Sequence, residues 1–213
     1  DLLIALVDKS LVVVEEVNAQ IRYRLLETVR QYAHEKLEAS GEVANTQARH
    51  LAYYLAFAEQ GAPHTQIGLP DWMARFETEY DNFRTAMEYA ICQDPEFALQ
   101  LASSLSMFSD LTSRVKESYA WALRILAQTE SWPPGKLRAK ALWLAGDKAS
   151  VARDFERGQP LLEASLEMAT ALGDKQQMMV AVQGLCAMSW YRDDWELLGC
   201  YGEQHLTLSL ELD

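Results

Sequence analysis

Hydrophobic residues recur every three or four positions along most of the chain, which is the spacing of one face of an α-helix. The longest such run, Trp72–Ala90, predicts one long helix. An earlier run ends at Ser40-Gly41, where glycine can adopt the left-handed conformation that closes a helix. Asp94-Pro95 joins an N-cap acceptor to a proline at the first helical position, so another helix begins there. Gly61–Pro63 and Gly68–Pro70 are expected to bracket a loop.

One stretch has the pattern of β-structure. Leu11–Val14 and Ile21–Leu25 are rich in β-branched and aromatic residues, and the polar segment Glu15–Gln20 between them predicts a hairpin connection. Leucines and valines at helical spacing over Leu2–Val7 predict the end of a short helix. Because helix, hairpin and helix follow one another, we interpret residues 1–40 as the C-terminal part of a winged-helix domain whose earlier helices are missing.

The C-terminal third contains an internal repeat of 40 residues. The shift aligns Ala141 with Ala181, Ala145 with Leu185, Asp154 with Asp194, and Leu166 with Leu206. Each unit predicts two helices with small residues where they cross, an Asp N-cap between them and a Leu-rich second helix. Paired prolines in Ser131–Gly135 cannot continue a helix and mark a boundary.

The predicted fold is therefore mostly α, with antiparallel helix pairs forming a tetratricopeptide-like right-handed superhelix after the small hairpin. We expect a helical linker with a degenerate repeat in residues 41–130. Two repeats of about 40 residues are expected in 131–213.

Charge argues against nucleic-acid binding by this fragment. The 213 residues carry 19 Lys and Arg against 31 Asp and Glu, a net charge of −12, and every third of the chain is acidic. Neutralising phosphates requires a basic patch.

The longest apolar run has only eight residues, Leu51–Ala58, so we expect no membrane span. No secretory signal is visible, and three cysteines cannot form a closed disulfide set, so we expect a cytoplasmic location. The first residue is Asp1, which indicates part of a longer protein.

No known catalytic or metal-binding pattern occurs in the sequence. A phosphate-binding Gly-x-x-x-x-Gly-Lys-Ser/Thr loop, a Gly-rich dinucleotide turn and a Gly-x-Ser-x-Gly motif are absent, and the four histidines are not paired at metal-ligand spacing. Asp193-Asp194 could suggest a metal site, but we prefer the explanation that the pair supplies an N-cap and a negative charge at the start of a helix over residues 195–212. We predict no catalytic residue, no metal site and no cofactor in this fragment.

Several segments together resemble bacterial STAND-class regulators, which are signal-transduction ATPases that often regulate transcription. The matching segments are Leu6–Val12, Tyr23–Ala33, Arg49-His50 with Tyr53-Tyr54, Asp81–Met87, Leu162–Leu166 and Ala171–Asp174. In that family an ATPase module comes first, then a winged-helix domain that acts as an internal switch, then tetratricopeptide-like repeats that act as sensor or scaffold. The resemblance implies that ATP or ADP binds to an ATPase module of the same polypeptide.

The resemblance also points to one nucleotide-sensing position. Related regulators have a His-Asp pair where this chain has Leu26-Glu27, and that histidine contacts the β-phosphate of ADP. Leu26 cannot donate a hydrogen bond, so the position departs from the family pattern. Glu27 keeps the acidic character and can pair with Arg30 three residues later. The alternative is that Leu25, Leu26 and Val29 only pack the hairpin against the following helix.

A ligand-binding groove is expected on the concave side of the repeats, which the first helix of each pair lines. With the helices crossing near Ala145-Gly146 and Leu185-Cys186, the groove-facing residues are Lys140, Trp143, Asp147, Ser150, Gln183, Trp190 and Tyr191. A protein or peptide partner is the first expectation and a small-molecule inducer the second, because aromatic residues with a polar group favour interfaces. The alternative is that Trp143 and Trp190 belong to the core.

Together these observations predict a non-catalytic sensor or protein-interaction region of a STAND-type regulator. A free-standing adaptor built of tetratricopeptide-like repeats would explain the chain after residue 41 but not the hairpin. A DNA-binding winged helix with a dimerising helical tail is a third reading, which the acidic charge disfavours.

Overall fold

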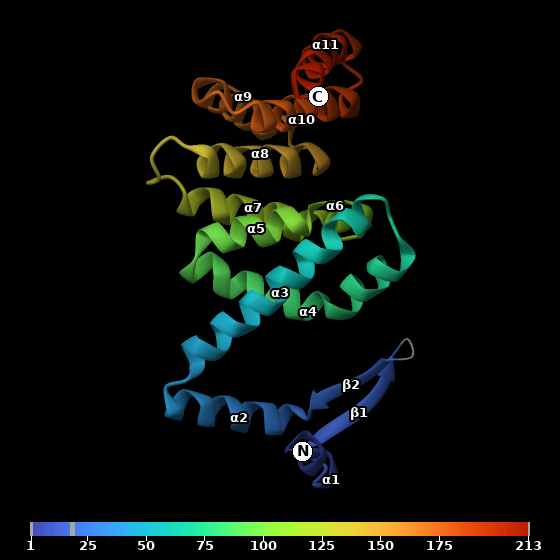
Figure 1. Cartoon of the computed structure of the whole chain (residues 1–213), viewed down its shortest axis with the longest axis vertical. Helices are drawn as coiled ribbons and strands as arrows, with labels where there is room; N and C mark the ends of the chain where they lie inside the picture. The colour runs from blue at the N-terminus through green and yellow to red at the C-terminus, as the bar shows by residue number, and fades with distance from the viewer. Residues whose placement is uncertain (1, 18–19, 213) are drawn as a thin grey trace. The chain divides into compact units, whose positions relative to one another are not determined.

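The computed structural model describes residues 2–17 and 20–212, which contain eleven α-helices and one two-stranded sheet (Figure 1). They form two compact units, Asp1–Arg49 and His50–Asp213. The mostly helical fold with a small N-terminal hairpin is the predicted one. In the described residues no helix is long and apolar enough to cross a membrane.

The first unit contains helix α1 (Leu2–Asp8), strands β1 (Val12–Val17) and β2 (Gln20–Leu25), and helix α2 (Glu27–Ser40). The strands are antiparallel, with Val12 opposite Leu25 and Val14 opposite Tyr23. Gly41 closes α2 at a φ of 74°, as its sequence predicts.

Strand β1 is longer than its sequence pattern suggested. Glu15 and Glu16 were expected in the connection but extend the ladder, opposite Arg22 and Ile21. Arg24 donates to the Glu15 carboxylate at 2.8 Å across the hairpin. Because side chains alternate between the two faces of a strand, a charged pair can occupy one face while Val12 and Val14 lie on the other. The rest of the predicted connection, residues 18–19, lies outside the described residues.

Helix α3 begins in the first unit and continues into the second, where eight further helices follow it among the described residues. Their bounds are α3 Val43–Gln66, α4 Pro70–Gln93, α5 Pro95–Ser104, α6 Ser106–Leu111, α7 Val115–Gln128, α8 Lys136–Val151, α9 Phe155–Leu172, α10 Lys175–Tyr191 and α11 Trp195–Leu212. Asp94 caps α5 through the Phe97 amide at 3.2 Å. The break at Ser131–Gly135 separates α7 from α8. Both features agree with the sequence.

The loop predicted to begin at Gly61–Pro63 is wrong, because α3 runs through it to Gln66. Gly61 is a packing position rather than a helix breaker. A Cβ added there would lie 2.2 Å from a ring carbon of Phe76 and 2.8 Å from one of Trp72, both on α4. Glycine lets the two aromatic rings pack directly on the α3 backbone. The turn lies instead at Gly68, at a φ of 64°.

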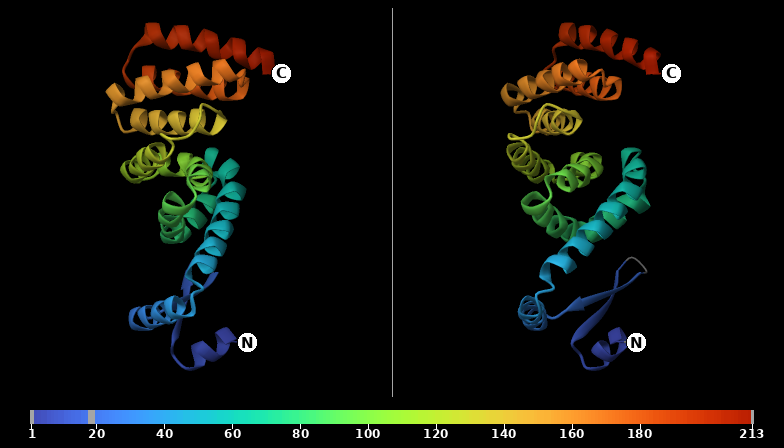
Figure 2. Two further views of the ribbon diagram at one scale, coloured as in Figure 1. Left: turned by 90° about the vertical axis from the view of Figure 1, so that its left-hand side faces the viewer. Right: turned by 60° about the vertical axis from the view of Figure 1, so that its left-hand side comes forward.

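Helices α8 to α11 form the repeat as stacked antiparallel pairs (Figure 2). Helix α9 packs against both α8 and α10, which also contact each other, and α10 packs against α11. Positions related by 40 residues are buried alike: Ala141 and Ala181, Ala145 and Leu185, and Ala149 and Ser189. Helices α7, α9 and α11 begin at Val115, Phe155 and Trp195, so the same offset extends back to α7.

The turns between paired helices repeat as well. Arg153 and Asp193 have positive φ angles of 62° and 58° at the ends of α8 and α10. Asp194 then accepts a hydrogen bond from the Leu197 amide at 3.1 Å. Among the described residues no group of three or more His, Cys, Asp or Glu side chains could hold a metal ion. The hydrogen bond that Asp194 accepts from the Leu197 amide makes it a helix cap.

The hydrophobic core of the second unit is richest in aromatic residues between α3, α4 and α6. Phe76, Phe83 and Phe108 are fully buried, and the Phe76 ring lies 5.0 Å from Phe83 and 5.5 Å from Phe108. A smaller core of Leu162, Leu185 and Met188 joins α9 to α10. These contacts fix the relative positions of the helices that carry the candidate site.

Candidate ligand-binding face on α8 and α10

Helices α8 and α10 run in the same direction and pack directly on each other, whereas α9 and α11 have little contact. In a curved stack of helix pairs, the row whose helices lie closer to one another lines the concave side. Lys140, Trp143 and Asp147 recur at helical spacing on α8 and are half-buried, whereas Gln183 and Trp190 recur at helical spacing on α10 and are exposed. We take these five of the seven sequence-predicted residues as the candidate face.

Lys140 is the positive charge of this face. Burial lowers the pKa of its ammonium group, and the carboxylate of Glu59 on α3 opposes that shift. A lysine in such a place is less hydrated than one in open water, so it interacts more strongly with an anionic group that reaches it. The sequence did not indicate Glu59, because this electrostatic interaction is between residues that are far apart in the chain.

Trp143 fills the space between the two helices and belongs to the core as much as to the surface. It is half-buried and packs against both hydrophobic clusters of the second unit. Its ring approaches α10 at Gly184, where a Cβ would lie 3.6 Å from the indole carbon Cδ1. The outer edge of this indole is all that a ligand could contact.

Asp147 is the acidic group of the face and is already engaged. Its carboxylate lies 3.2 Å from the ammonium of Lys148, which is 1% exposed. Lys148 also contacts both carboxylate oxygens of Asp110 on α6 at 2.6 Å. Burial raises the pKa of Asp110, and the charge of Lys148 opposes the rise. This buried pair joins α6 to α8 directly beneath the candidate face.

Ser150 does not line the face. It is 1% exposed, and its hydroxyl donates to the Gly146 carbonyl at 2.8 Å within α8. A Cβ added to Gly158 of α9 would lie 3.2 Å from this hydroxyl, so Ser150 sits where α8 and α9 cross. A small polar residue at helical spacing can serve close helix packing as well as a groove, and here it packs.

Trp190 and Tyr191 differ in accessibility. Trp190 is 58% exposed, and its ring lies edge-on to that of Trp195 at 5.2 Å. Tyr191 is half-buried beneath Arg153, whose guanidinium lies 5.9 Å from the ring and donates to the Tyr191 carbonyl at 3.2 Å. Tyr191 therefore belongs to the turn between helices, whereas Trp190 is open to a partner.

Leu26 and Glu27 lie in the first unit and are described on their own. Leu26 is 41% exposed and precedes α2 in extended conformation, without a side-chain cap. Glu27 forms the expected pair with Arg30 at 2.7 Å. Hydrogen bonding from Arg30 lowers the pKa of the Glu27 carboxyl group. Leu26 is thus an accessible apolar residue beside an ion pair.

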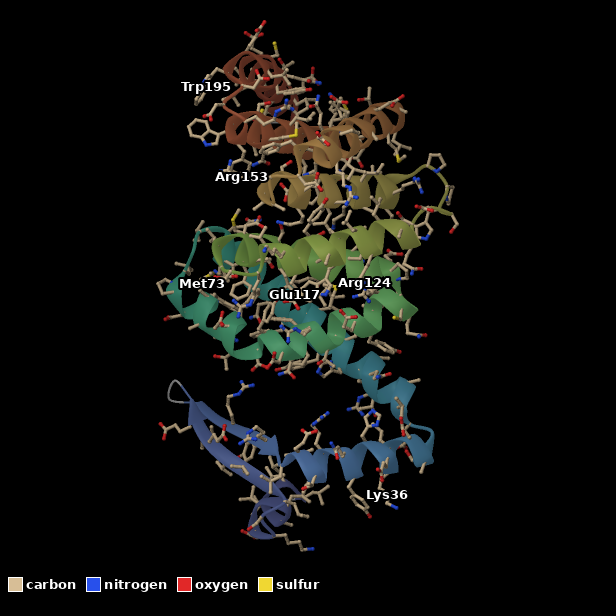
Figure 3. The ribbon with its side chains drawn as sticks, turned by 180° about the vertical axis from the view of Figure 1, so that it is seen from behind. Lys36, Met73, Glu117, Arg124, Arg153 and Trp195 are labelled. Carbon is tan, nitrogen blue, oxygen red and sulfur yellow. The ribbon has the colours of Figure 1, made fainter. Side chains whose placement is uncertain are left out.

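A polar hollow between α4 and α7, with a volume of about 520 Å³, was not anticipated from the sequence. Glu117, labelled in Figure 3, lines the hollow and joins the two helices. Its carboxylate accepts from the Tyr80 hydroxyl at 2.6 Å and from Arg84 at 2.9 Å. Desolvation, more than the nearby Glu117 charge, raises the pKa of Tyr80 well above its ordinary value.

Two further ion pairs extend this row of polar contacts between α4 and α7, which we call the polar seam. Arg114 contacts Glu77 at 2.5 Å, and Arg124 contacts Glu88 at 2.8 Å. The seam runs parallel along α4 and α7, so each carboxylate meets a residue 33 to 37 positions away. Its charges are largely satisfied by one another, which makes it a structural connection before it is a binding site.

Comparison with known proteins relates the chain to bacterial transcriptional regulators. It is 44% identical over 131 residues to "Putative HTH-type transcriptional regulator Rv0890c" of Mycobacterium tuberculosis and to "Putative HTH-type transcriptional regulator Mb0914c" of Mycobacterium bovis. Each match covers 59% of this chain and 14% of the relative, so the matched part is about one seventh of those proteins. No family model and no solved structure matches the chain.

Proposed function

We propose that this chain is the non-catalytic sensor and protein-interaction region of a STAND-type signalling ATPase that regulates transcription. The observation that carries the proposal is the 44% identity to a small part of much larger proteins named as HTH-type transcriptional regulators. The order of hairpin, helix and helix-pair repeats supports it, because it is the order that the resemblance to STAND-class regulators implies.

In this proposal the face of α8 and α10 binds the signal. Lys140 offers a partly desolvated positive charge, Trp190 an exposed aromatic ring, and Gln183 hydrogen bonds to a peptide backbone. Such a combination suits a protein or peptide segment better than a small inducer, because the groups are spread over two helices. Binding can switch the regulator only if the ligand has a higher affinity for one packing of the repeats than for another.

We assign the remaining activities of the regulator to parts of the polypeptide outside this chain. ATP or ADP would bind to the ATPase module of the same polypeptide, and the fragment itself would supply no catalytic group, cofactor site or nucleic-acid contact. Leu26 and Glu27 would then report the nucleotide state through packing and an ion pair rather than by contact with phosphate. The expected location is the cytoplasm.

The STAND assignment is tested by reading the gene upstream of the codon for Asp1. We expect a Gly-x-x-x-x-Gly-Lys-Ser/Thr loop that follows a predicted strand within about 300 codons, a domain or two of sequence. Absence of such a loop would overturn the coupling to an ATPase. The chain would then be interpreted as part of a helical-repeat adaptor.

The ligand face is tested in the full-length regulator, with a reporter for genes whose expression changes when the regulator is deleted. The triple variant Lys140→Ala, Gln183→Ala, Trp190→Ala is expected to lower the reporter response by roughly tenfold, as for loss of a small binding hot spot. Trp143 is left intact because it supports the core. Arg157→Ala, at an exposed position of α9, serves as the control. An unchanged response in the triple variant would exclude the α8 and α10 face.

A further inference from the structure

Helix α11 has two apolar faces, and only one of them is used within the fold. On the inner face Leu208 is buried, and Tyr201 packs against the cluster of α9 and α10. On the outer face Trp195, Leu206 and Leu210 are 58%, 61% and 69% exposed. Their spacing of eleven and four residues places them in one line along the helix. A surface helix normally has polar residues there, and exposed apolar residues aligned along one face of a helix are typical of an interaction site.

Two glycines interrupt this stripe where the fold does not require them. No atom lies within 4 Å of the positions that a Cβ would occupy at Gly199 and Gly202. By contrast, a Cβ at Gly146 or Gly184 would lie 2.7 or 2.8 Å from Leu162, because helices of the repeat cross there. The α11 glycines leave a shallow gap between Trp195 and Leu206 that another helix can approach closely.

A ridge of acidic residues runs beside the stripe. Glu196 and Glu203 are exposed on α11, and Glu156 and Glu163 occupy the equivalent exposed positions 40 residues earlier on α9. In the part of the chain that the structure describes, no Lys or Arg side chain forms an ion pair with Glu156, Glu196 or Glu203. Figure 3 shows Trp195 at the edge of the α10–α11 pair, projecting away from the helix stack.

We infer that the outer face of α11 is a docking site for an amphipathic helix of another protein, one whose apolar stripe is flanked by Lys or Arg. The leucines and Trp195 would cover the partner's apolar stripe, the glycines would admit its side chains, and Glu196 and Glu203 would attract its basic flank. A second copy of this chain fits less well, because its own α11 would bring the same acidic ridge against this one in a protein of net charge −12. The α11 site borders the α8 and α10 face, because the Trp195 ring lies 5.2 Å from that of Trp190, but its argument does not depend on the proposed function.

The test uses two synthetic helical peptides with the same leucine stripe, one flanked by lysines and the other by glutamates. Each carries a fluorophore, and its binding to the 213-residue protein is followed by anisotropy. We expect the lysine peptide to bind and the glutamate peptide not to bind. Leu206→Glu with Leu210→Glu should weaken binding by roughly tenfold or more, as for loss of interface anchors. The milder Leu206→Gln should act in the same direction and guards against misfolding, which circular dichroism checks.

Charge-matched variants separate a site from general attraction to an acidic protein. Glu203→Lys should weaken the lysine peptide several-fold, whereas Glu130→Lys, the same charge change at an exposed position after α7, should not. Equal losses in the two variants would overturn the proposal, as would equal binding of the two peptides. Sedimentation that showed a dimer, dissociated by Leu206→Glu, would assign the face to a second copy and also overturn it. Gln183→Arg on the α8 and α10 face should leave peptide binding unchanged.

Discussion

At the scale of single residues, glycine serves two opposite purposes in this chain. Gly61 has no room for a side chain, since Phe76 and Trp72 pack on its α-carbon, whereas Gly199 faces open space in an ordinary helix. The sequence did not reveal the role of Gly61, because it predicted a loop at Gly61–Pro63, whereas both glycines lie within helices. The difference lies only in what the neighbouring helix places opposite them.

This difference makes a paired prediction for stability. Gly61→Ala should destabilise the protein by about 1–3 kcal/mol, because the new methyl group overpacks the α3–α4 interface. Gly199→Ala should stabilise α11 by roughly 0.5–1 kcal/mol, because alanine loses less backbone entropy in a helix. Urea unfolding followed by circular dichroism measures both. Changes of the same sign would contradict the packing described for Gly61.

His50 makes the stability depend on pH. Burial lowers the pKa of its imidazole, and a hydrogen bond with Asn82 partly opposes the shift. The ring also lies 4.6 Å from that of Tyr54, whose hydroxyl donates to Glu79 at 3.0 Å. Because the folded state resists protonation of His50, the unfolded chain binds more protons below the ordinary histidine pKa.

The contribution of His50 to stability is therefore complete above pH about 6.5 and is lost as the pH falls from there toward the lower folded pKa. His50→Gln should reduce the fall in melting temperature between neutral pH and pH about 5. Differential scanning calorimetry over this range compares the two proteins. Parallel curves for the parent and the variant would show that His50 does not contribute.

At the scale of elements, helix ends were more predictable than helix contacts. Gly41 and Asp94 end and begin helices by local chemistry, and the prolines after Ser131 lie in the break between α7 and α8, so each could be predicted from a few residues. The polar seam between α4 and α7 joins residues far apart in the chain, and nothing local indicates which carboxylate meets which arginine. For the same reason the burial of Ser150 and the partial burial of Lys140 could not be foreseen.

The polar seam predicts that removing the carboxylate of Glu117 lowers the free energy of unfolding more than removing that of Asp81. Glu117→Ala should destabilise the α4–α7 contact by about 1–3 kcal/mol, because the buried Tyr80 hydroxyl loses its acceptor. Asp81→Ala should cost less than about 0.5 kcal/mol, since Asp81 is highly exposed and lies 3.5 Å from Arg84. Chemical unfolding of both variants tests this. Equal costs would mean that the Tyr80–Glu117 hydrogen bond adds nothing beyond surface charge.

At the scale of the whole molecule, the two units differ in how much core they contain. Among the side chains described in the first unit, only Val12 is buried, and Leu2, Ile21 and Tyr23 are more than half exposed. The second unit buries most of the apolar residues that its helical periodicity marks, including the aromatic cluster of α4. Because burial of apolar surface is the main favourable term in folding, the stability of the chain resides largely in the second unit.

Hydrogen exchange should separate the units. Amides in the hairpin and α2 are expected to exchange with little protection, because local unfolding there exposes almost no new apolar surface. Amides in α8 and α10 should exchange only when the second unit opens as a whole. Mass spectrometry of exchanged, pepsin-digested protein gives both values. Strong protection of the hairpin amides in this chain would mean that the apolar face of the hairpin is covered. We would then abandon the interpretation of residues 1–40 as the open part of a larger domain.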